Sequence, residues 1–463
     1  MTRQRSEGPR GGCSGGVAAS RWVGALSALL LLNACATYRP LPLPETADLA
    51  GGLSQIKVDS GRFPLPRLAA HPFDTSDGLD WVEVAMLAVA NNPALKASRL
   101  DRGEAAAQVF AAGLLPDPGL SATLSRPTNG VGNVNGFDLG LDYDLKALLT
   151  RNAGRRVEEA ARQQVDLQLL WQEWQVIQKA RQLTLAVGVS RRKLALLEAA
   201  QTAAERQYER SRRLLRQGDL TLAVAAAEAS TWFDLNSRLQ RQRREESKQR
   251  HALQALLGLS PEVTLPLAPL PTVSPGRSMV RPGDWSSLPQ HRPDLLALQA
   301  GYHSQEQRVR QAILAQFPAL QIGFTRARDT DGLYTSGLGI TLELPLFSGG
   351  RGEIRVARAT RARLRGEYQA RLDQTRSDVA RLLDRQDLLQ AQYSDLQRQL
   401  PALGSLVATA RAAHARGDLP TLDLRNLETT LLQRRLEAID LQQALWRVRI
   451  ALDTLLAWPE TKE

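Results

Sequence analysis

Side chains that could do chemistry are few in this chain, and they are scattered. The two cysteines are Cys13 and Cys35, and the five histidines form no HExxH motif or other paired spacing. A zinc site needs three or four converging ligands, usually with two of them at short spacing. The sequence therefore predicts no metal site, no cofactor and no catalytic residue.

One glycine-rich stretch, Ser348 to Gly352, could bind a phosphate group. It follows a predicted strand and precedes a predicted helix, where backbone N–H groups can bind an anion. However, it lacks the Gly-Lys-Ser/Thr ending of a P-loop. The preceding strand also alternates between apolar and polar residues, whereas the buried strands of parallel sheets are apolar throughout. We expect no enzyme here, and nucleotide binding would be the contrary observation.

Cys35 is the residue for which the sequence predicts a specific modification. Basic residues precede an apolar run of about 10 residues, which is too short to span a bilayer core as a helix. The run ends in Leu32-Asn33-Ala34-Cys35, a match to the bacterial lipobox. Acylation of Cys35 would anchor the chain at a membrane, and Ala36, which is not Asp, favours the outer membrane. Processing would also remove Cys13, so no disulfide framework is expected. The alternative is a signal that merely contains a cysteine.

The net charge of +11 does not predict nucleic-acid binding. Most arginines lie in helical stretches, mixed with Glu, Asp and Gln. This mixture is typical of a solvated helix surface.

The predicted helices and strands that could position any site occur twice, in the same order, along the sequence. Asn-Pro-Ala-Leu at Pro93 returns as Arg-Pro-Asp-Leu at Pro293, and Gln-Gly-Asp-Leu at Gly218 returns as Arg-Gly-Asp-Leu at Gly417. Each half runs from helices through two short alternating segments to a long helical hairpin. The pattern indicates a duplicated unit, which usually builds a large symmetric object.

The repeats divide the chain into five predicted segments. These are a signal peptide over residues 1–34, a lipidated N-terminus and extended Pro-rich leader over 35–75, a first repeat over 76–257, a connector over 258–284 and a second repeat over 285–458. Strand pairs are expected at 119–145 and 318–347, and helical hairpins at 152–257 and 351–457.

The predicted strands each have one apolar and one polar face. Strands of roughly 8 to 10 residues can cross a bilayer when tilted, but four strands cannot close a barrel. In lipid, an open sheet would leave unsatisfied backbone groups at its edges. If the strands lie in a membrane, several chains must therefore share one barrel. The alternative is a small soluble sheet with one solvent-exposed face.

The predicted hairpin helices are too long for a compact globule. The stretch from Gly154 to Gln217 contains no proline and would be roughly 95 Å long as a helix. Its apolar residues from Leu183 to Leu215 fall at coiled-coil-like spacings. We expect the helices to pack side by side into a bundle or tube.

This ordered set, together with the lipobox and the Pro345-Leu346-Phe347-Ser348-Gly349-Gly350-Arg351 segment after the fourth strand, resembles the TolC-like outer-membrane efflux factors. The resemblance is greatest to their lipoprotein branch in resistance-nodulation-division type systems and covers about residues 76–458. It implies a mainly α fold with a small β part. Three chains would contribute four strands each to a 12-stranded barrel, which continues as a long α-helical barrel.

The resemblance also implies a function and partners. The chain would be a passive, non-enzymatic conduit in the outer membrane of a Gram-negative bacterium. It would work with a periplasmic adaptor and an inner-membrane pump. The alternative is a periplasmic adaptor or structural coiled-coil lipoprotein, although an adaptor needs only one hairpin, flanked by compact β domains.

Three groups of site residues follow from the resemblance. The adaptor would dock at the two hairpin turns, where glycine allows the reversal, leucine offers an exposed apolar contact and aspartate caps the returning helix: Gln217, Gly218, Asp219, Leu220, Arg416, Gly417, Asp418 and Leu419. The alternative is that Gly-Asp is simply good turn chemistry. Asp423 would lie at the closed aperture, while Asn426 stands where a second acid is expected. The lumen of the barrel would be lined by Asp138, Asp142, Asp144 and Glu343.

Overall fold

The computed structural model describes residues 38–59, 61, 63, 66–129, 134–269, 275–276, 282–347 and 349–456. The predicted signal peptide, Cys35 and Ser348 lie outside these residues. The chain forms two units, Met1–Asp48 and Leu49–Glu463. In the first unit, residues 38–48 are exposed and form no helix or strand.

The second unit contains the same series of elements twice. The first series is α3 (Trp81–Asn91), α4 (Pro93–Ala112), β1 (Gly119–Ser125), β2 (Gly136–Asp144), α5 (Leu145–Gln217) and α6 (Leu222–Leu256). The second is α7 (Pro282–His291), α8 (Pro293–Leu314), β3 (Ala319–Arg328), β4 (Tyr334–Glu343), α9 (Arg351–Ala415) and α10 (Thr421–Leu456). Two short helices, η1 (Leu53–Gln55) and α2 (Pro66–Ala70), precede them.

The four strands form one antiparallel sheet in the order β1-β2-β3-β4. Their register keeps the alternation in phase across the sheet. Leu120, Leu141, Phe324 and Leu338 form one row on the apolar face. Gly119, Asp142, Gly323 and Gly339 form the adjacent row on the polar face. The predicted division into two faces therefore extends over the whole sheet.

Helix α5 begins earlier than the sequence predicted. The strand was expected to run to residue 145 and the helical hairpin to begin at 152, but β2 ends at Asp144 and α5 begins at Leu145. The reason is a cap: the Asp144 carboxylate accepts a hydrogen bond from the backbone N–H of Ala147 at 2.9 Å. Strand and helix are therefore joined without a loop.

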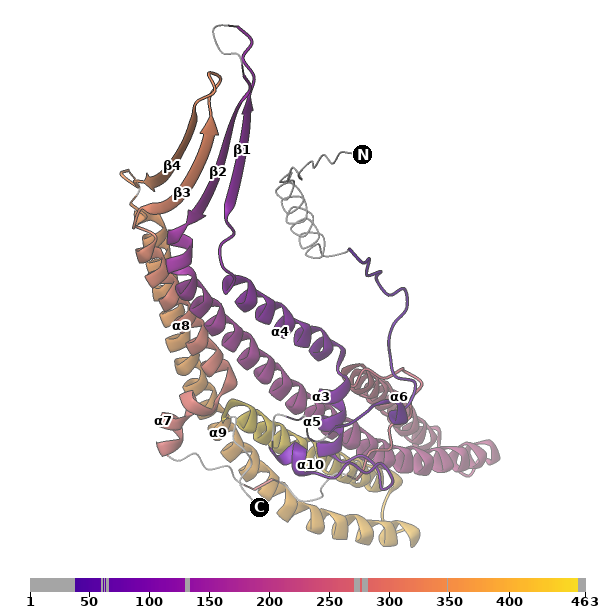
Figure 1. Ribbon diagram of the computed structural model, residues 1–463. Coiled ribbons are helices and arrows are strands. Elements are labelled where there is room, and N and C mark those ends of the chain that lie inside the picture. Colours follow the sequence, from indigo (N-terminus) through magenta and orange to yellow (C-terminus); the bar gives the residue numbers. More distant parts are fainter. Residues whose placement is uncertain are drawn as a thin grey trace, which may run out of the picture. The chain divides into compact units, whose positions relative to one another are not determined.

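The long helices pack as the apolar spacing predicted. Val187, Leu197 and Ala204 of the predicted seam are buried in α5. On either side of Val187, α5 also packs against α10, where Leu185 and Val189 meet Ile439 and Ile450. Figure 1 shows the sheet at one end of the long helices, with both helical hairpins turning at the opposite end. None of the helices in the described ranges combines the length and the apolar character that crossing a bilayer requires.

Part of the predicted leader is packed. Leu53, Ile56 and Phe73 contact the core of the first repeat, which is built around α3. Ala50 pairs with Leu259 in an isolated parallel bridge. The described residues between 49 and 75 therefore do not form the extended leader that the Pro-rich tract predicted, because their apolar side chains cover the base of the first hairpin.

Candidate functional site

The first hairpin turn is built around Gly218. Its φ of +83° lies in the left-handed region that favours glycine. The Gly218 N–H donates to Leu215 O at 3.1 Å, and the Asp219 N–H donates to Leu214 O at 3.0 Å. This pair of bonds is a Schellman motif, which satisfies the last carbonyl groups of α5.

The second turn repeats the geometry and adds side-chain bonds. Gly417 has a φ of +86°. It donates to His414 O, while Asp418 donates to Ala413 O at 2.9 Å. In addition, Arg416 Nε donates to Asp418 Oδ2 at 2.9 Å, and His414 Nδ1 donates to Leu419 O at 2.8 Å. The second turn therefore has more internal bonds than the first.

The structure revises the expected roles of the turn side chains. Gln217, Gly218, Asp219, Arg416, Gly417 and Asp418 are exposed, but Leu220 and Leu419 are half-buried. The exposed apolar side chains are instead Leu222, at 71% exposure, and Leu422, at 57%. The expected aspartate caps are also wrong, because Thr221 is the N-cap of α6 and Asp418 bonds to Arg416. The sequence analysis missed Leu222 and Leu422 because the helix surface that they occupy is set by where α6 and α10 begin.

Behind the turns, an ion-pair network joins the two hairpins. Arg425 of α10 donates from Nε to both oxygens of Glu228 of α6, at 3.0 and 3.2 Å. Glu228 is only 1% exposed. Arg425 also pairs with Glu428, which accepts a bond from Arg411 Nε of α9 at 2.7 Å. The network therefore brings three helices together close to the turns.

Asp423, the predicted aperture residue, lies in the first turn of α10 and is exposed. Asn426 is also exposed. A carboxylate in the first turn of a helix is stabilised by the helix dipole. The described residues thus place an accessible negative charge beside the turn, two residues before Arg425.

The four predicted lumen acids lie on the polar side of the sheet. Asp138 is paired with Thr123 and Ala327, and Glu343 with Ala319. Asp142 is flanked by Gly119 and Gly323, and a Cβ at position 119 would lie only 2.6 Å from its carboxylate. Asp144 lies on the same polar face, and its carboxylate also caps α5. Glycines therefore give Asp142 the room it occupies.

The glycine-rich stretch serves as a turn into α9. Gly349 and Gly350 have φ values of +51° and +67°, and Gly350 is the N-cap of α9. Arg351 donates to Phe347 O at 3.0 Å. These contacts account for the glycines without a bound phosphate.

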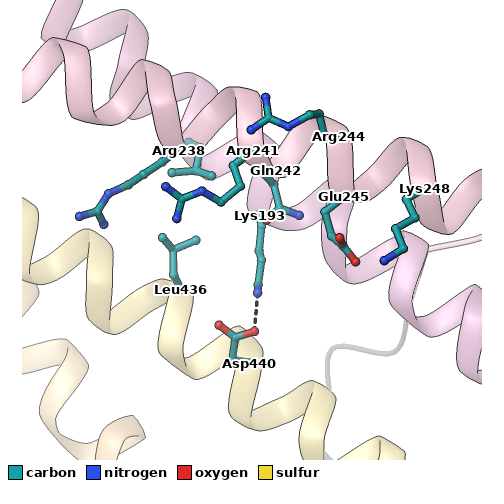
Figure 2. A pocket seen from close by; sticks show the side chains of 10 residues that line it. Lys193, Arg238, Arg241, Gln242, Arg244, Glu245, Lys248, Leu436 and Asp440 are labelled. Carbon is teal, nitrogen blue, oxygen red and sulfur yellow. Dashed lines mark hydrogen bonds and ion pairs between the residues drawn. The ribbon is translucent and has the colours of Figure 1, made fainter.

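A basic hollow lies between α5, α6 and α10 (Figure 2). Its volume is about 460 Å³, and half of its ten lining residues are cationic: Lys193, Arg238, Arg241, Arg244 and Lys248. Lys193 pairs with Asp440, and Arg238 pairs with Asp234 at 2.8 Å. The hollow lies on the helical hairpins, away from the turns and the sheet.

Three carboxyl groups outside the turns and the sheet have shifted pKa values. The pKa values of the Asp74, Glu262 and Asp378 carboxyls are lowered, and all three lie at the surface. The first cause in each case is a hydrogen bond, from the Ser76 backbone, the Ser260 side chain and the Gln374 side chain respectively. Within the described ranges, no group of three or more His, Cys, Asp or Glu side chains could hold a metal ion.

Comparisons with known proteins give a family match for part of the chain and a fold match for most of it. Residues 285–457 match the family described as outer membrane efflux protein. The fold is that of CusC, described as forming a transmembrane channel, with a TM-score of 0.70 at 19% identity over 91% of this chain and 99% of that chain. The family match covers the second repeat, whereas the fold likeness extends over most of the chain.

Two other solved structures share this fold. The CmeC outer membrane channel of Campylobacter jejuni has a TM-score of 0.69 at 16% identity, covering 91% of this chain and 94% of that one. VceC, an outer membrane protein of Vibrio cholerae, has a TM-score of 0.67 at 19% identity, covering 81% and 95%. The fold likeness of this chain therefore includes both repeats, although the family match covers only the second.

One curated relative also matches. It is a probable outer membrane lipoprotein, SilC of Salmonella typhimurium, at 24% identity over 187 residues. The aligned region covers 38% of this chain and 41% of that relative. The sequence similarity to this relative is therefore confined to part of each chain.

Proposed function

We propose that this chain is the outer-membrane channel of a tripartite efflux system, a passive conduit for small molecules or ions. The observation that carries the proposal is the sheet, whose apolar and polar rows stay in phase across all four strands. Such a sheet can face lipid on one side and water on the other. The fold likeness to solved channels over both repeats supports the same function.

The channel is proposed to be a homotrimer. The sheet has two free edges, β1 and β4, and unpaired backbone groups in lipid cost several kcal/mol each. Three copies would close a 12-stranded barrel and leave no edge. The acidic residues Asp138, Asp142, Asp144 and Glu343 would then face the water-filled lumen. Native mass measurement of the protein in detergent should give three chains, and a stable monomer that is soluble without detergent would contradict both barrel and conduit.

The helical turns are proposed to dock the periplasmic adaptor that links the channel to the inner-membrane pump. The glycine turns, from Gln217 to Leu220 and from Arg416 to Leu419, present backbone and polar groups. Leu222 and Leu422 supply exposed apolar contact beside them. Asp423 is proposed to hold the aperture closed until adaptor binding favours an open state.

Two variants test this docking surface. Leu222→Asp with Leu422→Asp should abolish export in cells while leaving the trimer intact, because both side chains already face solvent. Leu388→Asp, an exposed leucine in the middle of α9, is the matched control and should export normally. Normal export by the double variant would show that docking lies elsewhere.

The aperture has its own test. Asp423→Ala should raise single-channel conductance in a planar bilayer and sensitise cells to large antibiotics. Asn426→Ala, a neutral change close by, is the control. Unchanged conductance in the Asp423 variant would place the constriction at other residues.

Lipidation at Cys35 is proposed from the lipobox and is consistent with the relative described as a lipoprotein. Labelling with a radioactive fatty acid should mark the wild type but not Cys35→Ser. The variant should still assemble, because the barrel supplies its own contact with the membrane. An unlabelled wild type would contradict the lipid anchor.

A further inference from the structure

The apolar face of the sheet carries two arginines at one end of β3. Leu320, Ile322 and Phe324 are followed on the same face by Arg326 and Arg328. This end of β3 adjoins the β3–β4 turn, and Figure 1 shows that the turn lies at the end of the sheet away from the long helices. The arginines therefore lie just beyond the apolar band.

Aromatic rings surround the second arginine. Arg328 is paired with Phe137 on β2 and with Tyr334 on β4. Its guanidinium lies 5.4 Å from the centre of the Tyr334 ring, and that ring is 6.2 Å from the ring of Phe137 in an edge arrangement. Aromatic residues of this kind mark the level where hydrocarbon meets headgroups in membrane proteins.

In the described strands, no acidic residue shares the face of the two arginines. The strand acids Asp138, Asp142, Asp144 and Glu343 lie on the opposite face by register. Asp329 comes next in the chain, but its Oδ1 accepts the backbone N–H groups of Asp331 and Leu333, each at 2.9 Å. Arg328 Nε is buried and has no hydrogen-bond partner among the described residues. Asp329 and Asp331 thus follow the arginines in the turn, but among the described residues no carboxylate forms an ion pair with Arg326 or Arg328.

Another copy of the chain would not cover these side chains. β3 is an inner strand, with β2 on one side and β4 on the other, both from the same chain. Contacts between copies in a closed barrel would form along the free edges β1 and β4. The outer surface of β3 is therefore left to the surrounding lipid.

We propose that Arg326 and Arg328 bind the phosphate groups of a glycolipid in the outer leaflet of the membrane. Arginine suits this ligand because its planar fork can donate two hydrogen bonds to one phosphate and remains charged at every relevant pH. A charged side chain near the interface costs only about 0–1 kcal/mol, compared with about 2–4 kcal/mol at the midplane. The inference rests on the proposed function, since the apolar face meets lipid only if the strands lie in a membrane.

The test is lipid binding to the full-length protein in detergent, followed by native mass spectrometry. Three probes are compared: bisphosphorylated lipid A, its dephosphorylated form and phosphatidylglycerol. The wild type should bind bisphosphorylated lipid A about tenfold more tightly than the dephosphorylated form, because hydrogen bonds to charged groups contribute about this factor. Arg326→Gln with Arg328→Gln should lose that preference.

Two further variants keep the result interpretable. Arg206→Gln with Arg210→Gln removes two exposed arginines from α5 near the helical turn and should bind lipid A as the wild type does. Arg326→Lys with Arg328→Lys retains the charge and should keep part of the preference. Equal binding by the wild type and the glutamine variant, or equal binding of phosphorylated and dephosphorylated lipid A, would overturn the proposal. Equal binding of phosphatidylglycerol would overturn the choice of a glycolipid.

Conductance of the same wild-type sample separates this proposal from the proposed function. Conducting channels without a preference for phosphate would refute the glycolipid site and leave the channel intact. A sample that never conducts would refute the channel, while the binding measurements would still decide the phosphate preference.

Discussion

The two repeats start corresponding helices with the same Xaa-Pro dipeptide but stabilise that start by different chemistry. In the first, Asn92 Oδ1 accepts the Leu95 N–H at 2.9 Å, and Nδ2 donates to Leu256 O at 2.7 Å. In the second, buried Arg292 donates twice to Asp294, at 2.9 and 2.6 Å, and once to Thr375 at 2.7 Å. The backbone requirement is shared, because a residue before proline is held extended. The side-chain partners are not.

The difference also changes what each joint connects. Asn92 ties α4 to the end of α6, so its bonds remain within the first repeat. Arg292 bonds to α9 through Thr375, and its guanidinium lies 5.4 Å from the centre of the Trp171 ring on α5. The second joint thus connects the repeats to each other. Asn92 and Arg292 occupy equivalent positions in the two repeats. Only Arg292 is charged and contacts a helix of the other repeat.

The largest expected effect is at Arg292. Arg292→Met should destabilise the protein by about 3–5 kcal/mol, because it leaves the Asp294 carboxylate, 7% exposed, buried without its partner. Arg371, at 3.9 Å from Asp294 and half-exposed, does not replace two short hydrogen bonds. Asn92→Ala should cost only about 0.5–2 kcal/mol, the usual cost of losing a cap.

Denaturant unfolding of both variants in detergent measures this contrast. Arg292→Met with Asp294→Asn should recover part of the loss, because it removes the unpaired charge. Equal destabilisation by Arg292→Met and Asn92→Ala would mean that the two joints are energetically alike.

An intermediate effect is expected where the hairpins are joined. Arg425→Ala should cost about 1.5–3 kcal/mol, since it removes charged hydrogen bonds to Glu228, which is buried. The cost should be smaller than at Arg292, because Arg425 is 19% exposed and its removal lets water reach the Glu228 carboxylate. Arg411→Ala should cost about 0–1 kcal/mol, because its pair with Glu428 is exposed. A double-mutant cycle of Arg425→Ala with Glu228→Gln measures the coupling. Additive effects of the two substitutions would show that the network does not link the hairpins.

Smaller effects than at Arg292 and Arg425 are expected at the turns, where the repeats are most alike. Gly218→Ala and Gly417→Ala should each cost about 1–2 kcal/mol, because alanine is strained at positive φ. A Cβ would meet nothing within 4 Å at either position, so the strain is confined to the backbone. Arg416→Ala should cost about 0–1 kcal/mol, since its pair with Asp418 is exposed. Hydrogen exchange at the two turns measures these free-energy differences. Unequal destabilisation by Gly218→Ala and Gly417→Ala would show that the two turns are not energetically equivalent.

Much of the architecture could be read from the sequence because its signals are local or periodic. Alternation over a few residues predicted the four strands, and apolar spacing predicted the seam that buries Val187, Leu197 and Ala204. Repeated Gly-Asp-Leu segments predicted both turns, and proline marked the starts of α4 and α8. These features depend on backbone preferences and on periods of two or about 3.6 residues, which neighbouring residues specify by themselves.

Only the tertiary structure decided which distant side chains meet. The partners Arg292 and Thr375 are far apart in the sequence, as are Arg425 and Glu228, and no local pattern predicts such pairs. The packing of residues 49–75, the exposure of Leu222 and Leu422 and the isolated charges of Arg326 and Arg328 were settled in the same way. Burial and ion pairing depend on what lies across a helix or strand interface, and that neighbour is supplied by the fold, not by the adjacent residues of the chain.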